Sequence, residues 1–295
     1  MALNWQTFRT RALTAVIFVV VMLAGLLWNH WSFFLLFTLV HFGCWQEYQK
    51  LAGLIDPGYR QISPVHRYGV MLAGWLGMLQ FCGPEYTLGG IRLSEAGWWP
   101  CLGLLLLLPV ADYLVNKKVS VKNLAYSLFG LLYISLSFAL MMDLRREFFI
   151  ADIHIQQVGI PAWHLVVVPC AIIASIWIND TMAYIVGSMI GKTPLSKISP
   201  KKTWEGTLGG ILLALGVTGL LAWQFGFDYK VILIIAAISA IFGTFGDLLE
   251  SKLKRMAGVK DSGSLMPGHG GFLDRFDSLL LATPFVWLFV RQLMQ

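Results

Sequence analysis

The stretch KVILIIAAISAIFGTFGDLL at residues 230–249 decides the fold class of this chain. Its 20 residues include only two charged side chains, Lys230 at one end and Asp247 near the other. A helix that crosses a membrane needs about 20 mostly apolar residues. The apolar residues run continuously instead of alternating with polar ones, as they would in a transmembrane β-strand. The stretch therefore predicts a membrane-spanning helix.

The composition of the whole chain points to the same class of protein. Of its 295 residues, 57% are hydrophobic and 13% are charged. A soluble globular protein is about 45–50% apolar and about 25% charged, and a disordered chain combines low hydrophobicity with high charge. These percentages exclude both a soluble globular protein and a disordered chain. We expect an all-α, polytopic integral membrane protein.

Further stretches resemble residues 230–249, and together they predict about nine transmembrane helices. The predicted spans are 12–28, 31–46, 68–83, 96–115, 123–142, 162–180, 207–226, 230–249 and 279–293. If the N-terminus is cytoplasmic, 17 of the 22 Lys and Arg residues fall on the cytoplasmic side of this map. Cytoplasmic loops carry such an excess of positive charge. The N-terminus and the loops 191–206 and 250–278 are therefore predicted to be cytoplasmic.

Polar residues divide the chain unevenly. Residues 1–160 carry few polar groups inside spans and are expected to form a scaffold, whereas residues 161–295 carry nearly all of them. The apolar segment 181–190 is too short to span, so we expect a re-entrant piece or a surface helix there. Asp112 is followed by Tyr113 and by further lysines, so we expect it at the membrane interface with its side chain toward water.

The first charged cytoplasmic loop, 191–206, contains four lysines in eleven residues, from Lys192 to Lys202. Such a cluster is explained by contact with anionic lipid alone. Ser199 followed by Pro200 also predicts a helix start, with Ser as the N-cap and Pro in the first turn. A helix N-terminus flanked by lysines is suited to bind phosphate. We expect the loop to bind an anion.

The second loop, 250–278, places acidic residues at the predicted membrane surface. Asp247 precedes the loop at the end of one span, and Asp274 lies just before the next span. We expect their carboxylates to converge, which favours a hard cation such as Mg²⁺ that takes one or two carboxylates together with substrate phosphates. Asp277 follows Asp274 by three residues and shares its face if this stretch is helical. His269, between glycines, is read either as a ligand or as a structural residue.

The run SKLKRMAGVKDSGSLMPGHGGFLDRFD at residues 251–277 resembles the signature of phosphatidate cytidylyltransferases. Thirteen positions match the family pattern, and Met266 is a mild apolar departure from it. The matching residues are Ser251, Lys254, Arg255, Lys260, Asp261, Gly263, Pro267, His269, Gly270, Gly271, Asp274, Arg275 and Asp277. The segments 180–184 and 199–206 also resemble the family. Residues 1–174 are similar only in being apolar and helical by prediction.

The resemblance implies an enzyme that transfers CMP from CTP to phosphatidate, giving CDP-diacylglycerol and pyrophosphate, with Mg²⁺ as cofactor. It implies a homodimer in the inner (cytoplasmic) membrane, whose contacts we place in residues 1–160, with its active site facing the cytoplasm. It implies no nucleic-acid partner. Whether a second cation joins Mg²⁺ is left open.

Position and resemblance together give the charged residues their expected roles. The candidate metal ligands are Asp247, Asp274, Asp277 and Asp180. The candidate catalytic residues are Lys260, Asp261, His269 and Arg275. The candidate substrate contacts are Lys201, Lys202, Ser251, Lys254 and Arg255. We expect no Ser or Cys nucleophile, because the phosphate monoester of phosphatidate is itself largely ionised at pH 7.

Two other functions are compatible with a charged membrane protein. A CTP-dependent kinase of a polyprenol or another lipid would transfer the γ-phosphate and release CDP. A cation transporter would place acidic residues in the middle of spans and would show repeat symmetry. The sequence has neither feature of a transporter, and the match over residues 251–277 favours the cytidylyltransferase over the kinase.

Overall fold

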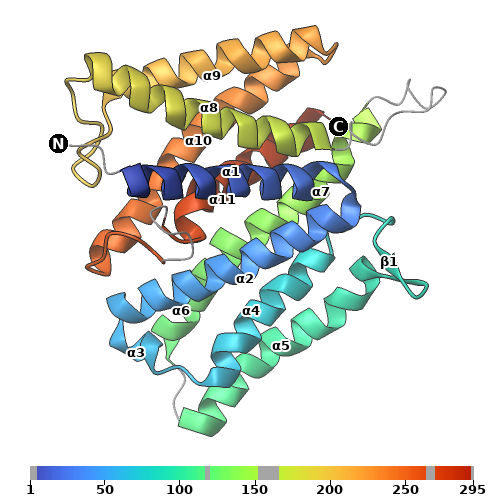
Figure 1. Ribbon diagram of the computed structural model, residues 1–295. Coiled ribbons are helices and arrows are strands. Elements are labelled where there is room, and N and C mark those ends of the chain that lie inside the picture. Colours follow the sequence, from blue (N-terminus) through green and yellow to red (C-terminus); the bar gives the residue numbers. More distant parts are fainter. Residues whose placement is uncertain (1–4, 117–119, 152–165, 264–269, 294–295) are drawn as a thin grey trace. The chain divides into compact units, whose positions relative to one another are not determined.

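The computed structural model of the chain describes residues 5–116, 120–151, 166–263 and 270–293, and most of them are helical (Figure 1). The only strands in these ranges, β1 (Thr87–Leu88) and β2 (Ile91–Arg92), pair as a short antiparallel hairpin. The helices are α1 (Trp5–Leu27), α2 (His30–Ile55), α3 (Pro57–Arg60), α4 (Pro64–Leu79), α5 (Leu93–Asn116), α6 (Val121–Gly130), the π-helical turn η1 (Leu131–Ser135), α7 (Leu136–Ala151), α8 (Val167–Ile190), α9 (Trp204–Gln224), α10 (Tyr229–Met256) and α11 (Leu273–Leu293).

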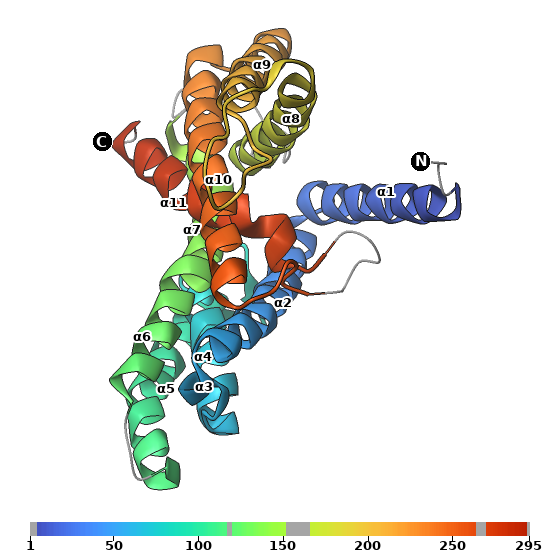
Figure 2. The same cartoon turned by 90° about the vertical axis from the view of Figure 1, so that its left-hand side faces the viewer.

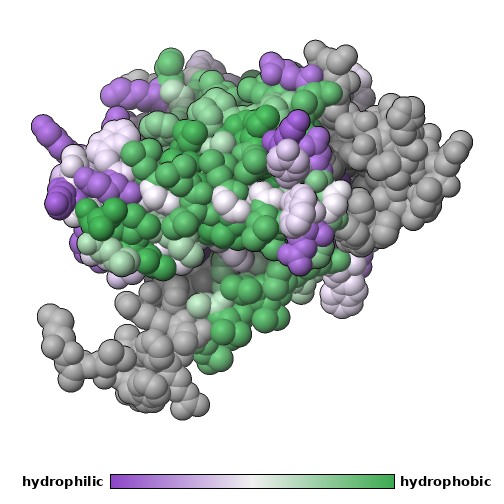
Figure 3. All heavy atoms as spheres, turned by 90° about the horizontal axis from the view of Figure 1, so that it is seen from above, coloured by the Kyte–Doolittle hydropathy of each residue, from purple (hydrophilic) through white to green (hydrophobic). Residues whose placement is uncertain are grey.

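Each predicted span overlaps a helix of the structure. Among the described residues, five helical stretches are long and apolar enough to cross a membrane. They are Leu93–Leu114, Val121–Arg145, Val167–Ile190, Trp204–Gln224 and Tyr229–Met256. Figure 3, seen from the side of α8 and α9, shows hydrophobic side chains across the middle of this face and hydrophilic ones toward its ends. The chain is a helical, multi-pass membrane protein, as predicted, while the total of nine spans stays a prediction.

The chain folds as two compact units that interleave in sequence. Unit 1 contains Met1–Met142 and Leu253–Phe276, and unit 2 contains Asp143–Lys252 and Asp277–Gln295. The predicted division near residue 160 into a scaffold and a functional part stays a prediction.

Polar side chains fix the helix ends and the interior of unit 1. Ser63 caps α4, since its Oγ accepts a hydrogen bond of 3.1 Å from the His66 N–H, and Pro64 occupies the first turn. The side chain of His66 contacts Asp112 through Nδ1, and its Nε2 lies 2.7 Å from Ser127 Oγ. Asp112 is only 4% exposed. The expectation that Asp112 reaches toward water is wrong, because a histidine from α4 supplies a buried polar partner.

In unit 2, α8 and α9 lie side by side along most of their length (Figures 1 and 2). Glycines permit the close approach: a Cβ atom on Gly206 would lie 2.6 Å from the Ala183 carbonyl oxygen, and one on Gly210 would lie 2.7 Å from that of Asn179. α8 continues without a break to Ile190. The expected re-entrant piece or surface helix at 181–190 is therefore wrong, and these residues form the last turns of α8.

Candidate functional site

The lysine-rich loop between α8 and α9 is held as a tight hairpin. The Leu195 N–H donates to the Lys202 carbonyl at 2.7 Å, and the Trp204 N–H donates to that of Thr193 at 2.9 Å. The carboxylate of Glu205 accepts from the backbone N–H groups of Lys192 and Thr193 at 3.1 and 3.2 Å. These bonds fix the direction in which the loop presents its lysines.

The predicted helix start at Ser199 and Pro200 is wrong. These residues form a turn, closed by a hydrogen bond of 3.1 Å from the Lys202 N–H to the Ser199 carbonyl. Pro suits the second position of such a turn as well as the first turn of a helix. α9 begins at Trp204, and its N-cap is Thr203, whose Oγ1 accepts from the Gly206 N–H at 3.1 Å.

A cluster of three acids and one lysine lies in unit 2. The Nζ atom of Lys202 forms an ion pair with Oδ2 of Asp247, which α10 carries. Asp180, from α8, also acts electrostatically on Lys202. Asp277, from α11, is 8% exposed and is under the influence of Asp247, Asp180 and Lys202 together. We call these four residues the acid–lysine cluster, and its three carboxylates leave it with excess negative charge.

Burial and charge act on Lys202 in opposite directions. Burial alone would lower the pKa of its ammonium group, but Asp247 and Asp180 outweigh this effect and raise the pKa above its ordinary value. Lys202 is therefore cationic at neutral pH. Both side chains of the ion pair remain accessible, with 29% of Lys202 and 27% of Asp247 exposed. A ligand is thus able to reach the pair.

The acid–lysine cluster opens into a cavity of about 540 Å³ in unit 2. Asp180, Asp247, Lys201 and Lys202 line it together with hydroxyl groups and the small residue Gly187. Ser251, which is 8% exposed, donates a hydrogen bond of 3.2 Å to Asp247 Oδ1 and orients that carboxylate. A space lined by both cations and carboxylates suits an anionic ligand that carries a cation with it.

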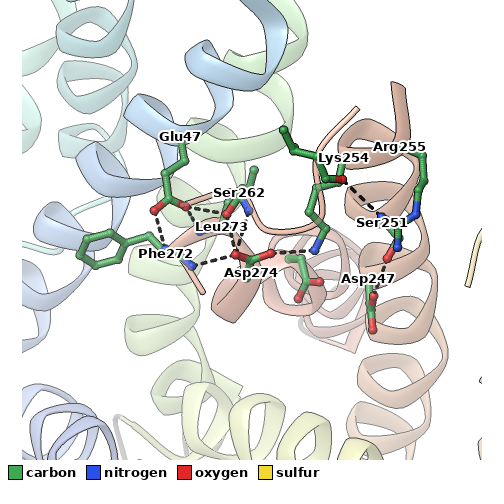
Figure 4. Close-up of polar contacts among 12 residues, drawn as sticks. Glu47, Asp247, Ser251, Lys254, Arg255, Ser262, Phe272, Leu273 and Asp274 are labelled. Atoms are coloured by element: carbon green, nitrogen blue, oxygen red, sulfur yellow. Dashed lines mark hydrogen bonds and ion pairs between the residues drawn. The ribbon is translucent and has the colours of Figure 1, made fainter. Parts of the chain in front are cut away.

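Asp274, in unit 1, accepts hydrogen bonds from the loop between α10 and α11 and from the end of α10 (Figure 4). Its Oδ1 accepts from Lys254 Nζ at 2.7 Å. Its Oδ2 accepts from the N–H and Oγ of Ser262 at 3.0 and 2.9 Å, and from the Gly271 N–H at 2.7 Å. Burial alone would raise the pKa of Asp274, but the bonds from Gly271, Lys254 and Ser262 lower it to about 2. Asp274 organises the loop around an ionised carboxylate.

Glu47 is a further residue of this arrangement that the sequence did not indicate. It lies on α2, yet it accepts hydrogen bonds from the Phe272 and Leu273 N–H groups at 2.9 and 2.8 Å (Figure 4). Its carboxylate also lies 2.7 Å from Ser262 Oγ, whose single proton it shares with Asp274. The carboxylate thus caps the N-terminus of α11, where an acid is favourable. Its one sequence signal is a lone acid directly after a predicted span.

Glycines of the signature make room for Glu47. A Cβ atom on either Gly263 or Gly271 would collide with its carboxylate, and one on Gly43 would collide with the ring of Phe272. Gly270 adopts a φ of +82°, a conformation that only glycine takes readily. The glycine-rich sequence is therefore explained by the approach of α2 to the loop.

The remaining candidates are Arg255, Lys260, Asp261, Arg275 and His269. Arg255 donates from Nη1 to the Val259 carbonyl at 3.3 Å. The side chains of Lys260, Asp261 and Arg275 are exposed. His269 lies outside the described residues. Asp247 belongs to unit 2 and Asp274 to unit 1, so their predicted convergence stays a prediction.

The donor set is compatible with a divalent cation that the substrate helps to bind. In the part of the chain that the structure describes, no three His, Cys, Asp or Glu side chains form a ready-made metal site. Mg²⁺ needs only one or two carboxylates, because water and phosphate oxygens complete its shell. The excess negative charge of the acid–lysine cluster fits this requirement. Asp247, Asp277 and Asp180 are the residues that could hold the ion.

A protein family matches nearly the whole chain, and individual known proteins match part of it. A family described as the cytidylyltransferase family matches residues 9–293. A Bacillus subtilis protein named phosphatidate cytidylyltransferase is 34% identical over 220 residues, which are 74% of this chain and 75% of that protein.

Two further relatives match a shorter part at higher identity. Phosphatidate cytidylyltransferase 5, chloroplastic, of Arabidopsis thaliana is 48% identical over 124 residues, or 41% of this chain and 30% of that protein. A Synechocystis protein named phosphatidate cytidylyltransferase is 50% identical over 121 residues, or 40% of this chain and 41% of that protein. The match thus spans less than half of each of these two relatives.

Proposed function

The chain belongs to the cytidylyltransferase family, and from this premise we propose that it is a phosphatidate cytidylyltransferase. It takes CTP and phosphatidate as substrates and gives CDP-diacylglycerol and pyrophosphate. The observation that carries this proposal is the accessible pair of Lys202 and Asp247 within a cavity that other charged side chains line. The names of the relatives support the choice of substrates.

The reaction needs positioning and charge stabilisation more than a protein nucleophile. A phosphate oxygen of phosphatidate attacks the α-phosphorus of CTP. The bond from that phosphorus to the oxygen bridging to the β-phosphate breaks, and pyrophosphate leaves with the electron pair. The phosphate monoester is largely ionised at pH 7, so no base has to remove a proton. The protein has to hold two anions together in line and to balance the charge that develops on pyrophosphate.

The cations at the cavity are suited to this task. Lys202 is held by Asp247, and Lys201 precedes it on the same hairpin. The hairpin bonds of Leu195 and Trp204 keep both lysines in place before substrate arrives. We assign to Lys201 and Lys202 the binding of CTP phosphates. Ser251 keeps Asp247 oriented through its hydrogen bond.

We propose that one or two carboxylates of the acid–lysine cluster, from among Asp247, Asp180 and Asp277, hold Mg²⁺ beside this cavity, which Asp247 and Asp180 line. When bound, the ion supplies Lewis-acid stabilisation of phosphate charge. Whether a second cation joins it is left open. Asp274 stays a candidate ligand, and any metal bound there has to displace Lys254 from its carboxylate.

The orientation in the membrane is part of the proposal. The excess of Lys and Arg in alternate loops supports a cytoplasmic N-terminus, nine spans and an active site on the cytoplasmic side of the inner membrane. CTP then arrives from the cytoplasm while phosphatidate stays in the leaflet. We further propose a homodimer through residues 1–160.

The test uses the purified full-length chain with labelled CTP and phosphatidate, with Mg²⁺ and with a chelator. We expect the variants Lys202→Gln and Asp247→Asn to lose at least about 100-fold in turnover, in line with the usual effect of a charge-stabilising group. Lys197→Gln is the matched control, since Lys197 lies exposed on the same loop. Equal activity of Lys202→Gln and Lys197→Gln, or full activity in the chelator, would contradict the proposal.

A further inference from the structure

A second charged cavity lies in unit 1, and its character differs from that of the acid–lysine cluster. It measures about 560 Å³ and is lined by residues of α2, α3 and α4. Three of these residues are cationic, namely Lys50, Arg60 and Arg67, and none of the described residues that line it is an Asp or Glu. We call it the basic cavity.

The positive charge of the basic cavity is not balanced from within. In the described part of the chain, none of its three cations is ion-paired with an acid. Arg67 donates from Nη2 to the Arg60 carbonyl at 3.3 Å, while its Nε atom is buried without a hydrogen-bond partner. A buried donor without a partner is unfavourable. An anion in the cavity would relieve the repulsion among the three cations.

The geometry of Arg67 favours a phosphate. Gln49, which is 8% exposed, donates from Nε2 to the Arg67 carbonyl at 2.9 Å and fixes the backbone of that residue. Guanidinium groups present several donors in one plane, which matches the oxygens of a phosphate.

The rim of the basic cavity is apolar and accessible. Leu54 is 44% exposed and Tyr68 is 64% exposed, and both line the cavity beside the cations. The loop 47–67 is predicted to be cytoplasmic, between the predicted spans 31–46 and 68–83. Tyr is enriched at the membrane interface, and basic clusters there attract acidic lipids. A ligand that joins an anionic head to apolar chains therefore matches both parts of the cavity.

We propose that the basic cavity binds the phosphate of an acidic phospholipid of the surrounding leaflet, through Lys50, Arg60 and Arg67. This site uses none of the residues that we assign to catalysis. The lipid is held by its headgroup charge, with its acyl chains along the exposed apolar side chains of α2 and α4. The proposal concerns binding, so it stands or falls independently of the reaction proposed above.

The test is native mass spectrometry of the purified full-length chain, titrated with phosphatidylglycerol or with phosphatidylcholine. We expect one phosphatidylglycerol to be retained at least about tenfold more tightly than phosphatidylcholine, as one charge-assisted contact would give. Arg67→Gln should remove this preference. The double variant Lys50→Gln and Arg60→Gln, whose side chains are exposed, should remove it too without disturbing the interior.

The matched control is Lys122→Gln, since Lys122 is an exposed lysine of the same unit that lines a different cavity. It should retain phosphatidylglycerol as the unmodified chain does. Equal loss in Lys122→Gln and in the double variant would show attraction by general surface charge and would overturn the proposal. Displacement of the lipid by millimolar inorganic phosphate would assign the cavity to a free phosphate instead and would equally overturn it.

Discussion

Replacing Glu47 by alanine should uncouple α2 from the signature loop and from the start of α11. The change removes two backbone hydrogen bonds to the carboxylate, of 2.9 and 2.8 Å. It also removes the 2.7 Å contact with Ser262 Oγ, whose single proton is shared with Asp274. Hydrogen bonds to a charged group contribute about 1.5–3 kcal/mol each. Water can reach part of this half-buried site, so we expect the lower value, about 1.5 kcal/mol, for each of the two backbone bonds, or about 3 kcal/mol in total. That corresponds to about a 100-fold shift toward an undocked loop.

Two measurements test this expectation. Amide hydrogen exchange at Phe272 and Leu273 should be strongly accelerated in Glu47→Ala, and kcat/KM for CTP should fall by at least about tenfold, within the limit set by the loop equilibrium. Glu47→Gln keeps one acceptor oxygen, so its exchange rate and its kcat/KM should lie between those of the unmodified chain and those of Glu47→Ala. Gly271→Ala should reproduce the effect, because its Cβ would collide with the same carboxylate.

The control for Glu47 is Glu95→Gln, which breaks an exposed pair with Arg92 in the same unit. Exposed pairs contribute little, about 0–1 kcal/mol. Unchanged exchange at the two amides in Glu47→Ala, with kcat/KM within twofold of Glu95→Gln, would refute a role for Glu47 in positioning the loop.

Three further outcomes follow from contacts inside single units. The pKa of Asp274 in the folded state is about 2, below the ordinary 3.8, so the ionised carboxylate should stabilise the folded protein at pH values above 3.8. The unmodified chain should therefore melt at a higher temperature than Asp274→Asn, and this difference should shrink as the pH falls from 3.8 toward 2. A difference that does not change with pH would argue against the assignment. His66→Ala leaves the buried Asp112 carboxylate with only the 3.3 Å hydrogen bond from Ser63 Oγ and should cost about 3 kcal/mol in the free energy of unfolding. A melting temperature equal to that of the unmodified chain would contradict this. Gly210→Val should separate α8 from α9 and lower both stability and turnover. Gly216→Val should have only a small effect on both, because a Cβ atom there meets nothing within 4 Å. Similar effects of the two variants would count against close packing at Gly210.

The helical membrane fold was predictable because span length and charge asymmetry are local properties of sequence. The predictions of local structure were wrong where one sequence pattern is compatible with two different structures. Ser199 and Pro200 suit both a helix start and a turn, and the hairpin contacts of the loop decide for the turn. The residues 181–190 are too short to span alone, but α8 continues into them and their glycine packs on α9.

The site was predictable in part for a related reason. Position and resemblance together indicated Lys202, Asp247, Asp180 and Asp277, and the structure brings these four into one cluster of unit 2. Glu47 was missed because its bonds to the loop cross more than two hundred residues of sequence, and no local pattern encodes such a contact. The partner of Asp112 was missed for the same reason.

The most direct test of CMP transfer is to follow separately labelled phosphorus atoms of CTP through one turnover with phosphatidate. Label at the α-phosphate should appear in the lipid product, and label at the γ-phosphate should appear in pyrophosphate. Recovery of the γ-label in the lipid, with release of CDP, would contradict the account and would identify a lipid kinase.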